Sequence, residues 1–270
     1  MTPPLPFTER QHRHLFIVAH VDDDGIGFGA GIQALPGVRI VYLTDSAPRD
    51  PRYFAQPCAS REAYAALRHE EALRAAALLG VAQDRLHFLD AVDMESFREL
   101  ERLEAALDRV CLDESPDVIW SPAYDGGHPD HDVAAFLATR IATRLRRPHF
   151  EFALYGSGNS IRPGEFTSGA PGFARRLSRV ERERKAGVLA AYVSQSRILR
   201  RLAVDRERFR PAHRTDFHRR PSDRKTLYES WGWPVDADML VEAFVAHDQR
   251  FPRPCEAGPA SPSSTPSACA

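Results

Sequence analysis

Two short segments of the chain concentrate side chains that can bind a metal ion. Residues 20–25 read His-Val-Asp-Asp-Asp-Gly, and residues 124–132 contain two histidines and three aspartates. Adjacent carboxylates repel one another, and a divalent cation nearby makes their charge favourable. Two imidazoles and one carboxylate are the usual protein ligands of an open catalytic site, where a remaining position takes water. Since the ion lowers the pKa of that water towards ~7, the two segments together predict a hydrolytic metal site.

Hydrolysis of this kind also needs groups that move protons. A carboxylate that is not a ligand can accept the proton of the attacking water, and a further histidine can act as an acid. Each segment taken alone is also typical of a solvated loop or a helix start, where aspartate is a favoured cap. Their joint presence favours the metal site.

The elements that position these segments are short apolar runs that alternate with helical patterns. Strands are predicted at residues 14–19, 38–44, 86–89, 117–121 and 150–155, and helices at 60–79, 96–112 and from 129 onward. Gly80 stands where the first of these helices should end. Strands that alternate with helices predict parallel βαβ units and a sheet covered on both faces. The predicted fold class is therefore α/β, as a three-layer Rossmann-like fold with a mostly parallel sheet.

The two metal-competent segments follow the first and the fourth predicted strands. Ligands of open parallel sheets bind beyond the carboxyl ends of the strands, so we expect the segments to meet there. Residues 10–250 are expected to form a single domain, in which 175–202 form one charged helix. Residues 252–270 are rich in Pro, Ser and Ala and are predicted to be a disordered tail.

Charge and composition narrow the possible partners. Lys and Arg number 36 against 37 Asp and Glu, so no global field attracts nucleic acid or anionic lipid. No apolar run reaches the roughly 18 to 20 residues of a membrane helix, and residues 1–6 lack the layout of a secretion signal. The four cysteines are scattered and are expected to be reduced thiols. These observations predict a cytoplasmic protein that acts on a small molecule, without nucleic-acid or membrane partners.

The two segments resemble the motifs of a known family. Residues 19–24, Ala-His-Val-Asp-Asp-Asp, resemble the AHPDDE signature of the LmbE-like (PIG-L) zinc N-deacetylases, and residues 126–132 resemble that family's HPDH motif. Val21 stands in place of the expected proline, and Asp24 in place of glutamate. The resemblance implies one divalent ion per chain, Zn²⁺ with Fe²⁺ or another metal as alternatives. It also implies a hydrolase that removes acetyl from an N-acetylglucosamine-type substrate.

Individual roles follow from the same resemblance. It implies His20, Asp23 and His131 as metal ligands and Asp22 as the general base that activates water. His128 would stabilise the tetrahedral oxyanion and pass a proton to the departing amine.

Further positions carry supporting roles in the resemblance. Asp130 would hold and charge the His128 imidazole, and Arg68 and Asp93 would contact the substrate. Arg68 is equally consistent with pairing to Glu71 on a solvated helix face, and Asp93 with an ordinary turn. Candidates for the distal wall of the site are Tyr155, Arg162, Gln195 and Trp231.

Four other functions remain open at this point. A phosphate-cradling turn at residues 25–31 is disfavoured, because the glycine spacing differs from a dinucleotide fingerprint and three aspartates would repel phosphate. A relative that binds metal without catalysis has no use for the free base Asp22 beside His128. Phosphoester hydrolysis commonly uses two bridged ions, whereas ligands are evident for one. An amidase acting on a thiol conjugate or another non-sugar amide is also consistent with the motifs.

Overall fold

The structure is a computed structural model that describes residues 5–155, 163–166, 169, 172–202 and 205–252. Arg162 and nearly all of the predicted tail lie outside the described residues. None of the helices in the described part combines the length and the hydropathy that crossing a bilayer requires.

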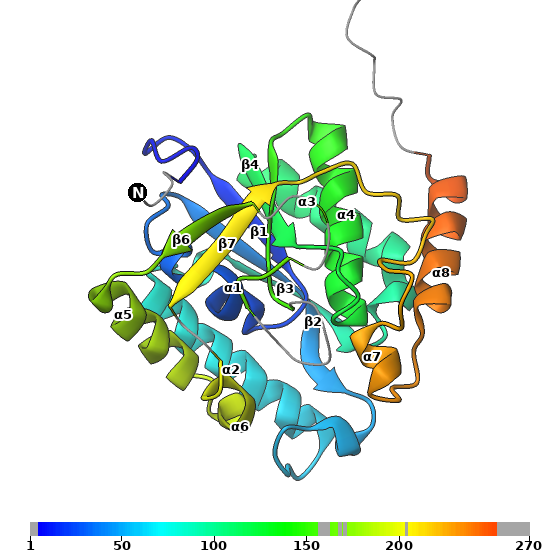
Figure 1. The fold of residues 1–270 in the computed structure, drawn as a ribbon, viewed down its shortest axis with the longest axis horizontal. Coiled ribbons are helices and arrows are strands. Elements are labelled where there is room, and N and C mark those ends of the chain that lie inside the picture. The colour runs from blue at the N-terminus through cyan, green and yellow to red at the C-terminus, as the bar shows by residue number, and fades with distance from the viewer. Residues whose placement is uncertain (1–4, 156–162, 167–168, 170–171, 203–204, 253–270) are drawn as a thin grey trace, which may run out of the picture.

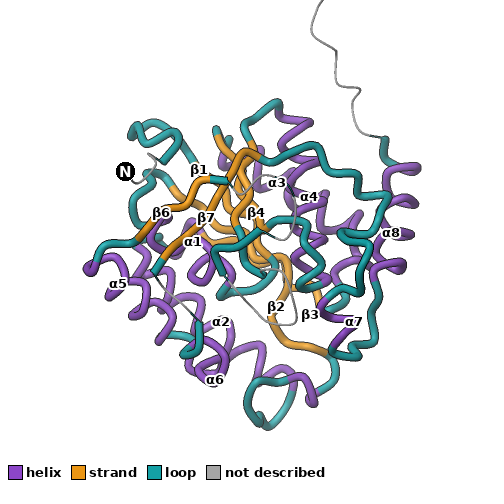
Figure 2. The backbone as a smooth tube through the Cα atoms, viewed as in Figure 1, coloured by secondary structure: helices purple, strands orange, loops and turns teal. Residues whose placement is uncertain are grey.

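A seven-stranded sheet forms the centre of the molecule (Figures 1 and 2). Its strands, in spatial order, are β3 (Leu86–Asp93), β2 (Val38–Pro48), β1 (His14–Val18), β4 (Val118–Pro122), β5 (His149–Phe152), β7 (Arg206–Pro211) and β6 (Phe173–Arg176). The first five are parallel to one another, whereas β7 is antiparallel to both β5 and β6. The mostly parallel α/β fold is thereby confirmed.

Helices cover both faces of the sheet and give three layers. They are α1 (Asp23–Ile32), α2 (Arg61–Leu79), α3 (Leu100–Glu114), α4 (Pro129–Leu145), α5 (Arg179–Ala190), α6 (Ser196–Leu199), α7 (Leu227–Ser230) and α8 (Ala237–Arg250). In Figure 1, α1, α2, α5 and α6 lie on one side of the sheet, and α3, α4 and α8 on the other. Each layer encloses its own apolar core, and both cores draw on residues from before and after β5.

Local sequence explains the elements nearest the site. All five residues of β1 are buried, as expected for an inner parallel strand with both faces covered. The Ser60 side chain caps α2 by accepting the Ala63 N–H, and Gly80 ends the helix at a φ of 80°. The helix predicted at 60–79 is therefore confirmed.

The glycine-rich segment after β1 forms α1, which packs very close to the sheet. A Cβ on Gly27 would lie 2.3 Å from the Phe152 ring of β5, so a side chain does not fit there. The helix is kinked at Phe28, whose φ is −144°. Beyond the kink, the buried Glu207 carboxylate of β7 accepts the N–H groups of Ala30 and Gly31.

The prediction of one helix over residues 175–202 is wrong. Its first residues belong to β6, and the helix α5 begins only after Ser178, which forms a reciprocal capping box with Glu181. α5 ends at Ala190, and a 3-10 turn separates it from the short α6. Two of the charges of this region, Arg175 and Lys185, pair with the buried Glu207 of β7, whereas most of the others on α5 are exposed.

Candidate active site

The two metal-competent segments meet at the carboxyl ends of β1 and β4. These neighbouring strands lie where the strand order reverses direction, since β2 and β3 follow on one side and β5 on the other. Such a switch point is the usual binding crevice of an open α/β sheet. Asp22 is the N-cap residue of α1, and His128 is the N-cap residue of α4, with Pro129 in its first turn. Both segments therefore lie at helix N-termini that converge on one crevice.

The predicted ligands His20, Asp23 and His131 lie in mutual contact. His20 Nδ1 is 3.1 Å from His131 Nε2, and His131 Nε2 is 2.9 Å from Asp23 Oδ1. Asp23 Oδ2 is 3.5 Å from His20 Nδ1 and accepts the backbone N–H groups of Ala19 and His20. All three side chains are buried. The turn of the backbone thus fixes the carboxylate against both imidazoles.

These separations suit a small tetrahedral ion. Zinc bonds of about 2.0–2.1 Å place neighbouring ligand atoms roughly 3.3 Å apart, close to the separations of His131 Nε2 from His20 Nδ1 and from Asp23 Oδ1. Charge points the same way. Burial acts to lower the pKa of His20, but the carboxylates of Asp93 and Asp23 outweigh it and raise that pKa well above its usual value. The site therefore attracts positive charge, which a divalent cation supplies, and the residues present fit such an ion.

The other edge of the His20 ring faces two further aspartates. His20 Nε2 is 3.1 Å from Asp93 Oδ1, at the end of β3, and 3.4 Å from Asp130 Oδ2. Asp130 in turn accepts hydrogen bonds from the Met94 N–H and from the N–H and hydroxyl of Ser96. Carboxylates in this position orient a ligand imidazole and raise its basicity. His20, Asp93, His128 and Asp130 also form a group with ligand atoms within 4.8 Å of one another.

His128 stands beside this cluster as a neutral imidazole. Burial and the adjacent His20 hold the pKa of His128 well below its usual value. Its Nδ1 accepts the backbone N–H of Asp130 at 3.2 Å, so the ring hydrogen is on Nε2. The Asp130 carboxylate lies 3.8 Å from that Nδ1, farther than from His20. In this structure the carboxylate of Asp130 thus supports His20 more directly than His128.

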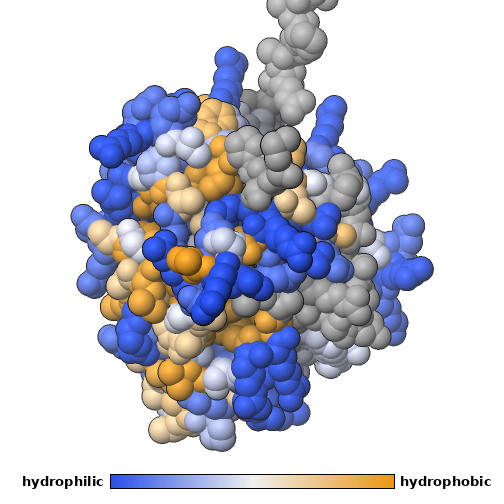
Figure 3. All heavy atoms as spheres, turned by 60° about the vertical axis from the view of Figure 1, so that its left-hand side comes forward, coloured by the Kyte–Doolittle hydropathy of each residue, from blue (hydrophilic) through white to orange (hydrophobic). Residues whose placement is uncertain are grey.

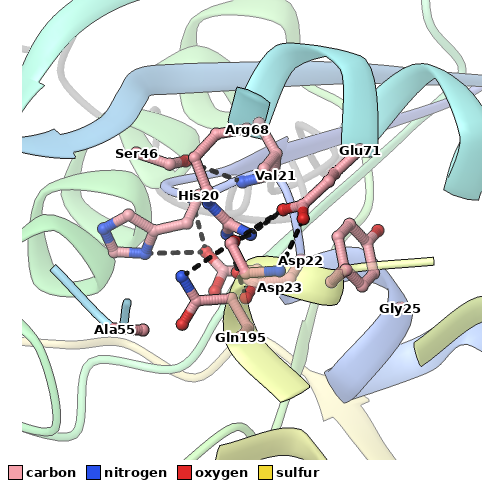
Figure 4. A network of polar contacts seen from close by, with 12 residues as sticks. His20, Val21, Asp22, Asp23, Gly25, Ser46, Ala55, Arg68, Glu71 and Gln195 are labelled. Carbon is pink, nitrogen blue, oxygen red and sulfur yellow. Dashed lines mark hydrogen bonds and ion pairs between the residues drawn. The ribbon is translucent and has the colours of Figure 1, made fainter. Parts of the chain in front are cut away.

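Asp22 is held by a buried arginine from α2. Arg68 is 1% exposed, and its guanidinium lies 3.0 Å from Asp22 Oδ2 and 2.9 Å from Glu71 Oε2. Ser194 completes the group by donating its N–H and its hydroxyl to Glu71. Figure 4 shows Arg68 reaching from α2 towards Glu71 and Asp22. The helix face of Arg68 is therefore buried, and its charge is shared between two carboxylates.

Both departures from the family motif have local compensation. The Val21 N–H donates to Ser46 Oγ at 3.1 Å, a bond that a proline at this position cannot make. Asp24 is buried, accepts the hydroxyl hydrogen of Tyr42 at 3.0 Å, and lies 3.4 Å from the hydroxyl of Tyr192. Burial raises the pKa of Asp24 to about 7. The shorter carboxylate thus finds partners on β2 and just after α5.

A cavity of about 370 Å³ opens over these residues. Seven of the eight predicted site residues line it, and Asp130 lies behind them, fully buried. Tyr155, Gln195 and Trp231 of the predicted distal wall also line it. Sequence reasoning missed Tyr53, Tyr64 and Trp233, which come from the β2–α2 connection, α2 and the residues after α7. The Trp-Gly-Trp run at 231–233 was the one local signal for them.

Comparisons with known proteins bear on the family and the fold of the chain. Residues 15–142 match the profile of the family described as PIG-L, GlcNAc-PI de-N-acetylase. No curated protein matches the chain. A deacetylase of teicoplanin biosynthesis, solved with teicoplanin, shares 19% identity at a TM-score of 0.59, over 76% of this chain and 99% of its own.

Two further solved structures are similar. The deacetylase of the A40926 pseudoaglycone has 17% identity and a TM-score of 0.56, over 72% of this chain and 86% of its own. The N,N′-diacetylchitobiose deacetylase from Pyrococcus horikoshii has 19% identity and a TM-score of 0.54, over 77% and 87%. At these identities the likeness shows a shared fold. The match to the PIG-L family model spans residues 15–142, and these residues carry both halves of the site.

Proposed function

We propose that this protein is a metal-dependent N-deacetylase that releases acetate from an N-acetylated amino-sugar conjugate. The observation that carries the proposal is the contact of His20, Asp23 and His131 beside Asp22, a carboxylate outside the ligand set. A purely structural metal site needs no such neighbour. The solved relatives are described as deacetylases of teicoplanin, of a pseudoaglycone and of diacetylchitobiose, which supports an amino-sugar amide as substrate.

In this proposal His20, Asp23 and His131 hold one divalent ion, Zn²⁺ first and Fe²⁺ or another metal as alternatives. The bound ion would supply Lewis acidity, which polarises the amide carbonyl and acidifies water. Asp22 accepts the proton of the attacking water. Arg68 fixes the Asp22 carboxylate at one oxygen, so the base keeps its direction without a change of rotamer.

His128 acts on the other side of the reacting carbonyl. As a neutral imidazole with its hydrogen on Nε2, it can donate to the oxyanion of the tetrahedral intermediate. Negative charge on that oxygen favours protonation of the imidazole. The proton that Asp22 took from the attacking water passes to the imidazole, and the protonated ring transfers a proton to the departing amine. The products are a free amino sugar and acetate.

The test is acetate release from N-acetylglucosaminyl conjugates by zinc-loaded protein, with bound metal counted separately. Asp22→Asn should keep one ion per chain while turnover falls by roughly 10²- to 10⁴-fold. His131→Ala should lose the ion itself. The exposed Asp84→Asn is the matched control and should behave as the parent. Parent-like turnover by Asp22→Asn would remove the base assignment, and unchanged zinc content in His131→Ala would remove that ligand.

Metal stoichiometry also separates the rival activities. One ion per chain supports the deacetylase, whereas two would support phosphoester hydrolysis. A teicoplanin deacetylase has a solved zinc-inhibited form, so zinc is best added at no more than one equivalent. The panel includes thiol-conjugate and other non-sugar amides, and a preference for these would redirect the substrate assignment. We further propose that the protein acts in the cytoplasm on a small molecule, without nucleic-acid partners.

A further inference from the structure

We propose that the amine-bearing half of the substrate carries an uncharged aromatic group, which stacks on an aromatic subsite formed by Tyr53, Trp231 and Trp233. This inference rests on the proposed deacetylase function and specifies which conjugate the enzyme accepts. It uses three side chains that have no role in the proposed chemistry.

The three rings form one continuous wall of the cavity. The Trp231 and Trp233 rings lie 5.3 Å apart at 52°, and the Tyr53 and Trp233 rings 6.1 Å apart at 65°. All three line the cavity that contains His128. Trp231 is 40% exposed, which is unusual for a ring that serves only the core. These geometries leave ring faces and edges available to a planar ligand.

Contact with His128 places this wall on the leaving-group side. The Trp233 ring lies 4.9 Å from the His128 imidazole at 72°, an edge-to-face contact. His128 is the group that passes a proton to the departing amine. The amine, and whatever is attached to its sugar, must therefore lie next to Trp233, and the aromatic subsite meets the aglycone.

Charge excludes an anionic aglycone. Among the described residues that line the cavity, Arg68 is the only lysine or arginine, and Asp22 and Glu71 already pair with it. The remaining charged lining groups are carboxylates and the histidines of the metal cluster. A phosphate or carboxylate on the aglycone would find no free cation among these described lining residues, and Asp93 would repel it.

The cavity lining offers fewer interactions to a second sugar ring than to an aromatic ring. The two neutral polar side chains of the lining other than tyrosines each already make a hydrogen bond within the protein. Ser46 Oγ accepts the Val21 N–H, and the Gln195 amide donates to Tyr64. The aliphatic lining side chains add apolar surface, and Ile198 among them is 40% exposed. The face of the molecule shown in Figure 3 also carries apolar patches between its charged side chains.

The first experiment measures binding to the chelator-treated full-length chain, which needs no turnover. The probes are methyl and phenyl glycosides of N-acetylglucosamine, N,N′-diacetylchitobiose and N-acetylglucosamine 1-phosphate. We expect the phenyl glycoside to bind roughly 10-fold tighter than the methyl glycoside, as stacking on two rings predicts. Trp231→Ala should remove most of that difference, and Tyr53→Ala part of it. Phe173→Ala removes an exposed ring of β6 outside the cavity lining and should change nothing.

The second experiment measures turnover of the same probes by zinc-loaded protein. Equal binding of methyl and phenyl glycosides, or tighter binding of the disaccharide or the phosphate, would overturn the inference. An arm with longer N-acyl chains on the methyl glycoside tests the opposite placement, and a preference for long acyl groups would also overturn it. If phenyl binding and its loss in Trp231→Ala persist but no amide is hydrolysed, the aromatic subsite stands and the deacetylase function fails.

Discussion

Replacing Arg68 by methionine tests the network that holds the proposed base. The change keeps most of the volume of the side chain but removes its charge from between Asp22 and Glu71, which lie 3.0 and 2.9 Å away. Glu71 keeps the two hydrogen bonds from Ser194, whereas no other ion pair is found for Asp22 among the described residues. The variant therefore leaves two carboxylates without their cation, one of them fully buried.

The structure sets the size of the effect. Removing one partner of a buried ion pair typically costs about 3–5 kcal/mol, because the other charge stays in a low-dielectric site. Arg68 is 1% exposed and Glu71 is fully buried, so the upper half of that range applies. For a chain of this size, 1 kcal/mol corresponds to roughly 2–4 °C in Tm. We expect Arg68→Met to melt about 10 °C below the parent.

Denaturant unfolding measures the loss of stability, and enzyme kinetics measure the loss of the anchored base. Arg68→Met/Glu71→Met replaces the pair by apolar groups and should recover most of the lost stability. It should not recover kcat, since Asp22 still lacks its anchor. Arg68→Lys keeps the charge but cannot bridge both carboxylates in a fork, so it should fall between parent and Arg68→Met.

Two results would refute this reasoning. An Arg68→Met protein within 1 kcal/mol of the parent would show that the ion pairs contribute little. A raised KM with unchanged kcat would return Arg68 to direct substrate binding, the role that the family resemblance implied.

Three further predictions address the core, the acid limit and the metal. Gly27→Ala drives a Cβ against Phe152 and should lower the free energy of unfolding in denaturant by about 1–3 kcal/mol. The control is Gly29→Ala, where the nearest atom to the added Cβ is 3.6 Å away, and it should be neutral or stabilising. Burial acts to raise the pKa of Glu104, but its hydrogen bonds to His and Arg partners outweigh this and hold it at about 2, below the ordinary 4.5. This carboxylate therefore stabilises the fold above pH ~4.5, and Glu104→Gln should be less stable than the parent at pH 7. The difference in stability between the two proteins should vanish as the pH falls towards 2. A difference that persists at pH 2 would contradict the assignment. Zinc at 100 times its Kd should stabilise the parent by about 2.7 kcal/mol in thermal unfolding, and a similar gain in His131→Ala would contradict its role as a ligand.

The sequence predicted those parts of the fold that carry local signals. The apolar content of β1 and β4 indicates two buried strands. Ser60 and Gly80 mark the start and the end of α2. The convergence of residues 20–25 and 124–132 followed from the rule that parallel strands end at one edge. Their contacts were therefore foreseeable without knowledge of the rest of the chain.

The remainder depends on partners far away in the sequence. β7 reads Arg-Glu-Arg-Phe-Arg-Pro, which gives no strand pattern, because Glu207 is buried by pairing with Lys185 and α1. The orientation of Arg68 towards Asp22, not only towards Glu71, requires α2 to lie against the end of β1. The position of Trp233 on His128 likewise depends on the irregular segment that joins β7 to α8. None of these contacts has a signature within a local window.

The Glu207 carboxylate limits which fragments of the chain can form the site. It accepts the N–H groups of Ala30 and Gly31, 177 and 176 positions earlier, just where the kink at Phe28 interrupts the helical hydrogen bonds. A polypeptide ending at residue 142 would contain every proposed metal ligand yet would lack the acceptor that completes α1. Such a fragment should bind zinc no better than a flexible peptide. Any transfer of this site to another scaffold would therefore have to include β7.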